Sequence, residues 1–481
     1  MVNAPFVGRK EELKSLNLLL SKKSASLAVV RGRRRIGKSR LIEEFARGQR
    51  FIHFAGIPPV EGITAQSERE VFAKQLGEQL GVPGLHALDW ADLFTLLAKF
   101  CSKERIIILF DEISWMASKD PTFLGKLKNA WDMEFKKNPK LILILCGSVS
   151  TWIQENIISS TAFFGRISLT INVEELPLSD CNILLEKQGF RGSVYEKFKI
   201  LSVTGGVPWY LEHIQPKLNA DENIKNLCFT KEGLLTSEFD LIFHDLFTKR
   251  SQLYKKIIET LAKGPLEFND ICQDLNLAKS GVVSEYLEDL VQAGFISRDF
   301  TWSLKTGKES RLSHFRLSDN YLRFYLRCIV QYKQKIQRES FKDMSLSTLP
   351  GWSSIMGLQF ENLVLKNRHD LQKLLKIKPE HIVADNPFFQ RTTTQQKGCQ
   401  IDYLIQTRFN VLYACEIKFS KNSITSDIIQ EMKTKLDRLA LPRGFACCPV
   451  LIHMGRVEDS VLTREYFTDV IDFSQLLEGG I

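Results

Sequence analysis

The sequence predicts an α/β fold, and three apolar runs are the basis of that prediction. The first run, residues 27–30, is followed by a glycine-rich loop and then by an amphipathic helix. The other two, residues 106–110 and 141–145, are unbroken in the way that is typical of strands buried on both faces of a parallel sheet. All three runs are far too short to span a bilayer, so we expect no membrane partner.

Size and composition set broad bounds. A chain of 481 residues exceeds what one hydrophobic core organises, and it predicts about three or four domains. The net charge of +9 allows an acidic partner such as nucleic acid without requiring one. The cysteines form no CxxC pair, which argues against a zinc knuckle. The first residues contain no apolar signal core, so a cytoplasmic location is expected.

The loop after the first strand reads GRRRIGKS and fits the pattern GxxxxGK[ST]. Between a strand and a helix, this pattern predicts that backbone N–H groups curl around the phosphates of ATP. Lys38 would reach the β- and γ-phosphates, and the Ser39 hydroxyl would hold Mg²⁺. The alternative is a glycine-rich turn that happens to contain Lys-Ser. The predicted nucleotide-binding residues are Gly32, Arg33, Arg34, Arg35, Ile36, Gly37, Lys38, Ser39 and Arg40.

Two carboxylates end the second apolar run. Asp111 is placed to bind Mg²⁺ and Glu112 to polarise the attacking water, because phosphoryl transfer needs both roles. The alternative is a pair of solvated acids at a strand end. Ser148, which ends the third run, is a predicted sensor of the γ-phosphate. Arg166 is either a surface residue or a group that stabilises transition-state charge. The segment 204–210 is either a lid contact to the nucleotide or a turn.

The motifs FVGR, GRRRIGKS, ILFDE, ILCGS, FGR and GGVP together resemble the archaeal-type AAA+ ATPases of the STAND group. The resemblance covers roughly residues 1–330. It implies a parallel αβα P-loop core, a helical lid and a winged helix, with ATP state used to switch or to assemble a homo-oligomer. The expected domains are a core over 1–175, a lid over 176–245, a winged helix over 246–320, a basic helix and linker over 321–350, and a last domain over 351–481.

The helical and strand periodicity of residues 251–317 independently favours a winged helix. Its third helix carries Glu285, Glu288 and Asp289, which DNA phosphates would repel. A structural or regulatory module is therefore expected rather than a reader of DNA sequence, although the basic wing remains free to touch a backbone. The basic, aromatic segment 321–342 is either a nucleic-acid contact or a solvated helix.

The last domain contains a predicted hairpin centred on Phe409. In that hairpin Asp402 and Glu416 lie opposite one another on one face, and Lys418 projects to the same face. Two carboxylates forced together favour a divalent cation between them, either Mg²⁺ or Mn²⁺. Lys418 would then either orient a hydroxide or stabilise a pentavalent phosphate.

This pattern resembles the PD-(D/E)xK nucleases, whose fold is the restriction-endonuclease-like α/β fold. The resemblance adds Glu361 as a third metal ligand and matches Gln430 to the helix glutamine. The alternatives are an ordinary surface hairpin and a nuclease fold without activity. The expected function is an ATPase coupled to a metal-dependent nuclease acting on DNA, in defence or repair. The competing hypothesis is a signalling or scaffolding ATPase whose last domain only binds nucleic acid or a partner.

Overall fold

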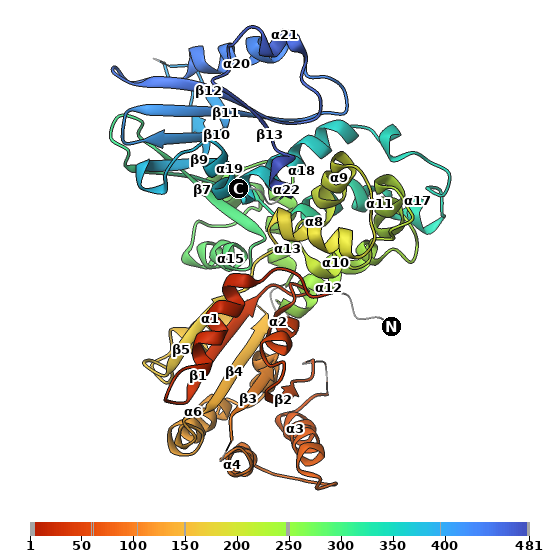
Figure 1. The fold of residues 1–481 in the computed structure, drawn as a ribbon, viewed down its shortest axis with the longest axis vertical. Coiled ribbons are helices and arrows are strands. Elements are labelled where there is room, and N and C mark those ends of the chain that lie inside the picture. Colours follow the sequence, from red (N-terminus) through yellow and green to blue (C-terminus); the bar gives the residue numbers. More distant parts are fainter. Residues whose placement is uncertain are drawn as a thin grey trace. The chain divides into compact units, whose positions relative to one another are not determined.

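The computed structural model describes residues 5–58, 60, 62–102, 104–148, 151–246, 251–394 and 396–478. The chain divides into two compact units, Phe6–Leu176 and the part that begins at Pro177 (Figure 1). Across the described residues, no helix is both long and apolar enough to cross a membrane. All ten cysteines are free thiols.

The first unit is built on a five-stranded sheet in the order β2-β3-β4-β1-β5, in which neighbouring strands pair in parallel. All three apolar runs are strands of this sheet, so that prediction is confirmed. The strands are β1 (Ser26–Gly32), β2 (Arg50–Ala55), β3 (Ile106–Asp111), β4 (Leu141–Ser148) and β5 (Ile167–Asn172). The helices are α1 (Lys10–Leu20), α2 (Lys38–Phe45), α3 (Ala65–Leu80), α4 (Trp90–Phe100), α5 (Ile113–Met116), α6 (Phe123–Met133) and α7 (Thr151–Ile153), with short turns at Phe135–Lys137 and Gln154–Ile158.

An aromatic cluster fills one side of this sheet. The rings of Phe54 and Phe72 stack with centroids 4.2 Å apart, and Phe110 meets both edge-on. Trp90 and Phe94 close the cluster from α4. Each of these side chains is fully buried, and burying one contributes about 2–3 kcal/mol. The cluster therefore holds rigid the strand β3 that ends in Asp111.

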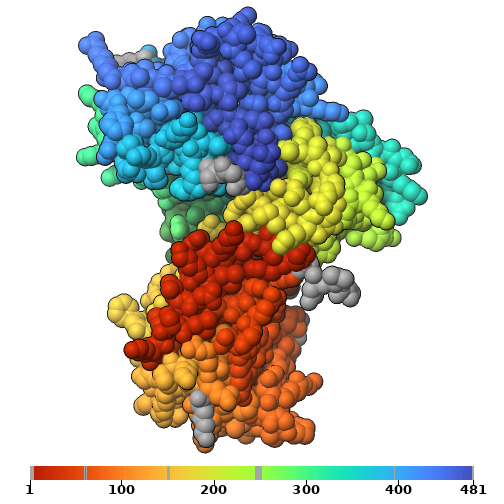
Figure 2. All heavy atoms as spheres, viewed as in Figure 1, coloured from red at the N-terminus to blue at the C-terminus, as the bar shows by residue number. Residues whose placement is uncertain are grey.

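The second unit opens with helices in the place of the expected lid. The helix α9 begins with a capping box in which Ser193 and Glu196 bond each other's backbone N–H groups. The final helix α22 packs on α8, where Asn182 Nδ2 donates to the Leu477 carbonyl at 3.0 Å; the yellow and dark blue surfaces meet there in Figure 2. The helices are α8 (Leu178–Lys187), α9 (Val194–Thr204), α10 (Pro208–Leu211), α11 (Ala220–Cys228), α12 (Leu234–Leu246) and α22 (Gln475–Glu478).

A winged helix follows, which confirms the prediction for this region. It has three helices and a small sheet in the order β6-β8-β7. The wing between β7 and β8 is not free, however, because its base packs on the C-terminal sheet. Trp302 Nε1 donates to Gln406 Oε1 at 2.6 Å, and Gln406 Nε2 donates to the Leu304 carbonyl at 2.9 Å. The elements are α13 (Ser251–Leu261), β6 (Leu266–Glu267), α14 (Phe268–Asp274), α15 (Gly281–Gln292), β7 (Ile296–Trp302) and β8 (Glu309–Leu317).

The basic segment that follows is not one continuous helix. It consists of α16 (Asn320–Phe324), a π-helical turn (Tyr325–Ile329), a 3₁₀ turn (Val330–Tyr332) and α17 (Lys333–Gln337). Two of its arginines turn inward to cap backbone carbonyls: Arg323 bonds Leu317 and Leu358, and Arg327 bonds Ala262 and Lys263. These two cations therefore stabilise the fold rather than a basic surface.

The C-terminal part is a mixed five-stranded sheet in the order β13-β12-β11-β10-β9 (Figure 1). Strand β10 pairs antiparallel with both β9 and β11, and β11, β12 and β13 run parallel to one another. Its core also takes in Trp302 and Leu304 of the winged helix. The elements are α18 (Trp352–Lys366), α19 (Arg368–Leu374), β9 (Ile382–Gln390), β10 (Cys399–Thr407), β11 (Val411–Phe419), α20 (Asp427–Arg438), β12 (Ala446–Met454), α21 (Asp459–Leu462) and β13 (Asp469–Asp472), with 3₁₀ turns at Leu346–Thr348 and Pro379–His381.

Candidate functional site

The glycine-rich loop joins the carboxyl end of β1 to the first turn of α2. Arg35 and Gly37 have positive φ angles of 67° and 90°, so consecutive backbone N–H groups turn toward one side of the loop. Such a concavity at a helix N-terminus favours an anion. Lys38 Nζ bonds the carbonyls of Gly32 and Arg33 at 3.0 and 3.1 Å, which holds its ammonium against the loop.

The segment before α1 also braces this loop. Arg9 is buried, and its guanidinium donates to the Ile36 carbonyl at 3.0 Å and to Glu12 Oε1 at 3.1 Å. In the sequence, FVGR is only one of the motifs of the family resemblance, and Arg9 has no predicted role. Two features of the sequence could have indicated the bracing role of Arg9. A cation follows a glycine there, and the loop just downstream has backbone carbonyls that need hydrogen-bond donors.

Ser39 and Asp111 meet beside the loop, although 72 positions separate them. Ser39 Oγ donates to Asp111 Oδ2 at 2.6 Å. His53, on the adjacent strand β2, places Nε2 3.5 Å from the same carboxylate oxygen. Burial raises the pKa of Asp111, but hydrogen bonds from His53, Ser39 and Cys146 outweigh burial and hold the pKa at about 2. The carboxylate is therefore ionised at neutral pH. His53 is a neighbour that sequence reasoning missed.

Glu112 lies on the same edge of the sheet, close to the end of β4. Its φ and ψ angles of 52° and 50° are left-handed, which is uncommon for a residue with a side chain and is found often at functional sites. Ser148 donates to the Glu112 carboxylate from both its N–H and its hydroxyl, each at 3.4 Å. Burial raises the pKa of Glu112. Ser148 pairs with Gly32 across the sheet, so β4 brings it between the loop and the acids.

Arg166 does not join this group. It directly precedes β5, whose first residue pairs with Leu27 near the start of β1, so it lies at the opposite edge of the sheet from the loop. The seven residues of β1, at about 3.3 Å each, put about 20 Å between the two edges. Arg166 instead forms a two-pronged pair with Asp132, with bonds of 3.0 and 2.8 Å. The parallel strand direction therefore argues against a role for Arg166 at the phosphates of its own chain.

The segment around Gly205 and Gly206 lies in the second unit, where it joins α9 to α10. Thr204 caps the end of α9 with its hydroxyl on the Ile200 carbonyl at 3.0 Å, and Pro208 begins α10. These bonds fit a helix-to-helix turn. A lid contact to the nucleotide stays a prediction.

In the C-terminal sheet, the hairpin register is the one predicted. The pairs run from Gln406–Leu412 to Tyr403–Cys415, and the next position along brings Asp402 opposite Glu416. Asp402 Oδ2 also accepts the backbone N–H of Ile417 at 3.0 Å. Glu416 is buried, and burial, followed by repulsion from Asp402, raises its pKa. Two close carboxylates in a dry site require a positive charge nearby.

The positive charge is supplied by Lys435 of α20. Its Nζ lies 3.2 Å from Asp402 Oδ1 and 2.5 Å from Glu416 Oε2, and Lys418 Nζ adds a contact of 3.1 Å to Glu416 Oε1. Among the described residues no group of three or more His, Cys, Asp or Glu side chains is placed to hold a metal ion. The donor types suit Mg²⁺ or Mn²⁺, but an ammonium stands where the cation was expected. The arrangement described here therefore does not fit the metal.

The remaining members of the predicted nuclease pattern are Glu361 and Gln430. Glu361, on α18, is half-buried, and burial raises its pKa, although Arg316 and Arg323 oppose that rise. Its charge in turn raises the pKa of Asp402, so Glu361 lies near the hairpin acids. Gln430 is exposed on α20, and its neighbour Glu431 bonds Lys418 at 2.9 Å instead. The match of Gln430 to a site glutamine therefore gains no support from the structure. Glu431 and Lys435 are four positions apart, so they share the helix face that meets the hairpin.

Comparisons with known proteins agree with the geometry of the first unit. Residues 6–214 match a family described as an ATPase domain predominantly from Archaea. Residues 255–298 match the description "bacterial regulatory protein, arsR family", which supports the helix-turn-helix part of the winged helix. Together with the strand order and the loop, the first match supports an archaeal-type P-loop ATPase domain.

The chain is also similar to one curated protein and to solved structures. The uncharacterized protein MJECL04 of Methanocaldococcus jannaschii is 26% identical over 380 residues, which cover 77% of this chain and 79% of that protein. A Walker-type ATPase of Pyrococcus abyssi is 17% identical, with a TM-score of 0.51 over 67% of this chain and 96% of that one, which shows the fold alone. The ORC2 protein of Aeropyrum pernix matches with 14% identity over 68% of this chain and 95% of its own; its TM-score of 0.43 supports no inference.

Proposed function

We propose that this chain binds and hydrolyses ATP in its first unit, and that its nucleotide state controls a nucleic-acid-directed second unit. One observation is the basis of the first half of this proposal. Ser39 and Asp111, delivered by α2 and β3, meet at 2.6 Å beside a loop with two left-handed residues. An ionised carboxylate and a hydroxyl are suitable ligands for Mg²⁺, and inward-turned N–H groups suit phosphates.

Each side chain then has a definite task. Mg²⁺, when bound, neutralises charge on the phosphates. Ser39 and Asp111 would hold the ion, and Lys38 would turn from the loop carbonyls to the phosphate oxygens. Glu112, held by Ser148, would orient the attacking water and accept its proton. The raised pKa of Glu112 brings this base closer to neutral pH, where a general base works best.

Two substitutions separate binding from hydrolysis. Lys38→Ala should weaken ATP binding by about tenfold or more, because a charge-assisted phosphate contact is lost. Glu112→Gln should keep ATP affinity but lower hydrolysis at least a hundredfold, in line with the loss of a general base. Lys99→Ala, an exposed change on α4, is the matched control and should alter neither. Hydrolysis by Glu112→Gln at the wild-type rate would contradict the assignment.

A metal-dependent nuclease is the second candidate function, and the hairpin favours it. Asp402 and Glu416 are opposite one another with Lys418 beside them, on a mixed five-stranded sheet. Lys435 argues against it, because its ammonium already neutralises both carboxylates. Placement in the STAND group and a role in defence or repair stay predictions.

Cleavage assays decide between this candidate and a domain that only binds. Plasmid and single-stranded DNA would be incubated with Mg²⁺ or Mn²⁺ and with wild type, Glu416→Ala or Lys435→Ala. A nuclease requires cleavage that Glu416→Ala abolishes. DNA affinity that survives Glu416→Ala without cleavage by any variant would select the signalling or scaffolding function.

Reading of DNA sequence by the winged helix is disfavoured by two features. The exposed residues Glu285 and Glu288 of α15 would be repelled by phosphates. At the wing, Trp302 and Leu304 are buried against the C-terminal sheet. We therefore assign nucleic-acid contact to the C-terminal part of the second unit. Self-association of the chain also stays a prediction.

A further inference from the structure

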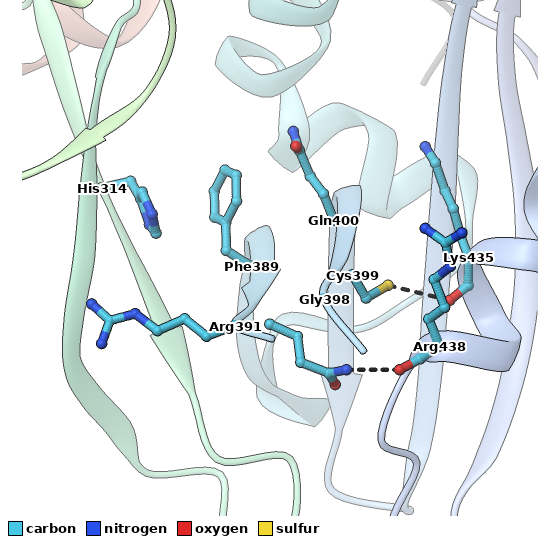
Figure 3. Close-up of a pocket in the computed structure, with 9 residues that line it drawn as sticks. His314, Phe389, Arg391, Gly398, Cys399, Gln400, Lys435 and Arg438 are labelled. Carbon is cyan, nitrogen blue, oxygen red and sulfur yellow. Dashed lines mark hydrogen bonds between the residues drawn. The ribbon is translucent and has the colours of Figure 1, made fainter. Parts of the chain in front are cut away.

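A cavity of about 480 Å³ lies between strand β8 of the winged helix and the C-terminal sheet. Figure 3 shows His314 and Arg391 on one side of this cavity, Lys435 and Arg438 on the other, and Phe389 between them. No aspartate or glutamate is among the described residues that line it. Its volume is within the range of small-ligand sites, and its wall is cationic and aromatic.

The three cations differ in what already binds them. Arg391 forms a two-pronged ion pair with Glu267, in which Arg391 Nε donates to Glu267 Oε1 at 3.1 Å. Lys435 is held by the carboxylates of the hairpin. The guanidinium of the exposed Arg438 forms no hydrogen bond or ion pair with any described residue. Arg438 is therefore the cation of this cavity that is available to a ligand.

The aromatic side offers a flat surface and an unused polar atom. The rings of His314 and Phe389 lie with centroids 4.3 Å apart and planes at 33°. His314 Nδ1 is buried and has no hydrogen-bond partner among the described residues. Such an atom costs free energy unless a ligand or water satisfies it. A planar, hydrogen-bonding ligand suits both features.

We propose that this cavity binds one nucleotide of a single DNA strand, with its base against Phe389 and His314 and its phosphate on Arg438. The inference rests on the proposed nucleic-acid function and names the site of contact. A single strand is required because a duplex keeps its bases stacked inside, where no side chain of the cavity reaches their faces. A strand bound here passes Lys435, and so runs beside Asp402 and Glu416.

Binding of a fluorescein-labelled oligothymidylate to the full chain, followed by anisotropy at several salt concentrations, tests the proposal. Arg438→Ala should lower the slope of log affinity against log salt by about 0.7, the value for one phosphate on a single strand. Phe389→Leu keeps apolar packing but removes the flat ring, and should raise the Kd at least about fivefold. Arg443→Ala removes an exposed charge outside the cavity and should change neither quantity.

Each other outcome overturns the proposal. Equal effects of Arg438→Ala and Arg443→Ala would reject the cavity while leaving nucleic-acid binding intact. No binding by wild type would reject both the cavity and the proposed nucleic-acid function, but not the ATPase. Displacement of the oligomer by a stoichiometric amount of free thymidine monophosphate would show a mononucleotide site instead. Loss of affinity in Arg438→Ala with no effect of Phe389→Leu would show a phosphate contact without base stacking and would reject the cavity as a nucleotide site.

Discussion

Replacing Lys435 with methionine removes the ammonium between two carboxylates and keeps the length of the side chain. At 3.2 Å and an effective dielectric constant of about 20, its attraction to Asp402 is about 5 kcal/mol, and the contact to Glu416 is shorter. Desolvation offsets most of this attraction. We expect a net loss of about 3 kcal/mol, the lower end for breaking a buried pair, because Lys435 is 29% exposed and Lys418 still contacts Glu416.

The loss should depend on pH in a defined direction. Burial raises the pKa of Asp402 and Glu416, and removing the ammonium raises the pKa of both further. Below its unfolded pKa of about 4, an acid whose pKa is raised in the folded state is protonated in both states and does not change the free energy of unfolding. As pH rises above that value, the acid destabilises the fold. Lys435→Met should therefore change the free energy of unfolding little at about pH 4. At pH 8 it should lower the free energy of unfolding by the full amount of about 3 kcal/mol.

Calorimetry of the transition of the second unit at both pH values measures this effect. A fall of about 5 °C is expected at pH 8. Lys433→Met, an exposed change on the same helix, is the control and should cause little change at either pH. If the carboxylates accept a divalent ion once the ammonium is gone, Mn²⁺ should raise the melting temperature of Lys435→Met more than that of wild type. A loss that is equal in the two variants, or independent of pH, would refute the reasoning.

Three further substitutions test other parts of the structure. Gly32→Ala places a methyl group 2.4 Å from the Val173 carbonyl at a φ of 157°, so we expect a loss of at least about 2 kcal/mol in the first unit, measured by denaturant unfolding. Trp302→Phe leaves Gln406 Oε1 without its donor and should cost about 1–3 kcal/mol, measured as a lower melting temperature of the second unit. Arg166→Ala should leave ATP affinity unchanged in calorimetric titration, because this arginine lies far from the loop; a tenfold weaker affinity would contradict the sheet geometry.

The parts that the sequence predicts well are those fixed by local patterns. Unbroken apolar runs require burial on both faces, and so they predict β3 and β4 with little error. The hairpin register follows from a short turn around Phe409, since a slip of one residue would turn the whole apolar face outward. The position of Arg166 was also available from the sequence, because the residue before a parallel strand lies at its amino end.

The wing shows a signal of a different kind. A solvent-exposed hairpin tip rarely carries large apolar side chains, yet Trp302 and Leu304 stand at the base of this wing. Their burial against Gln406 needs a partner surface about a hundred residues further along the chain. No local pattern identifies that surface, although the apolar residues themselves indicate that one exists.

Lys435 illustrates the same limit for charge. The spacing of Asp402 and Glu416 requires a nearby cation, and it leaves open whether an ion or a side chain supplies it. The supplier comes from α20, which crosses back over the hairpin only because Met432 and Ile428 bury their side chains in the core of this sheet. With the apolar face of the helix fixed, Glu431 and Lys435 project toward the hairpin, and both bond residues of the predicted site. Packing of the helix thus decides which cation is nearest, and a metal can enter only by displacing it.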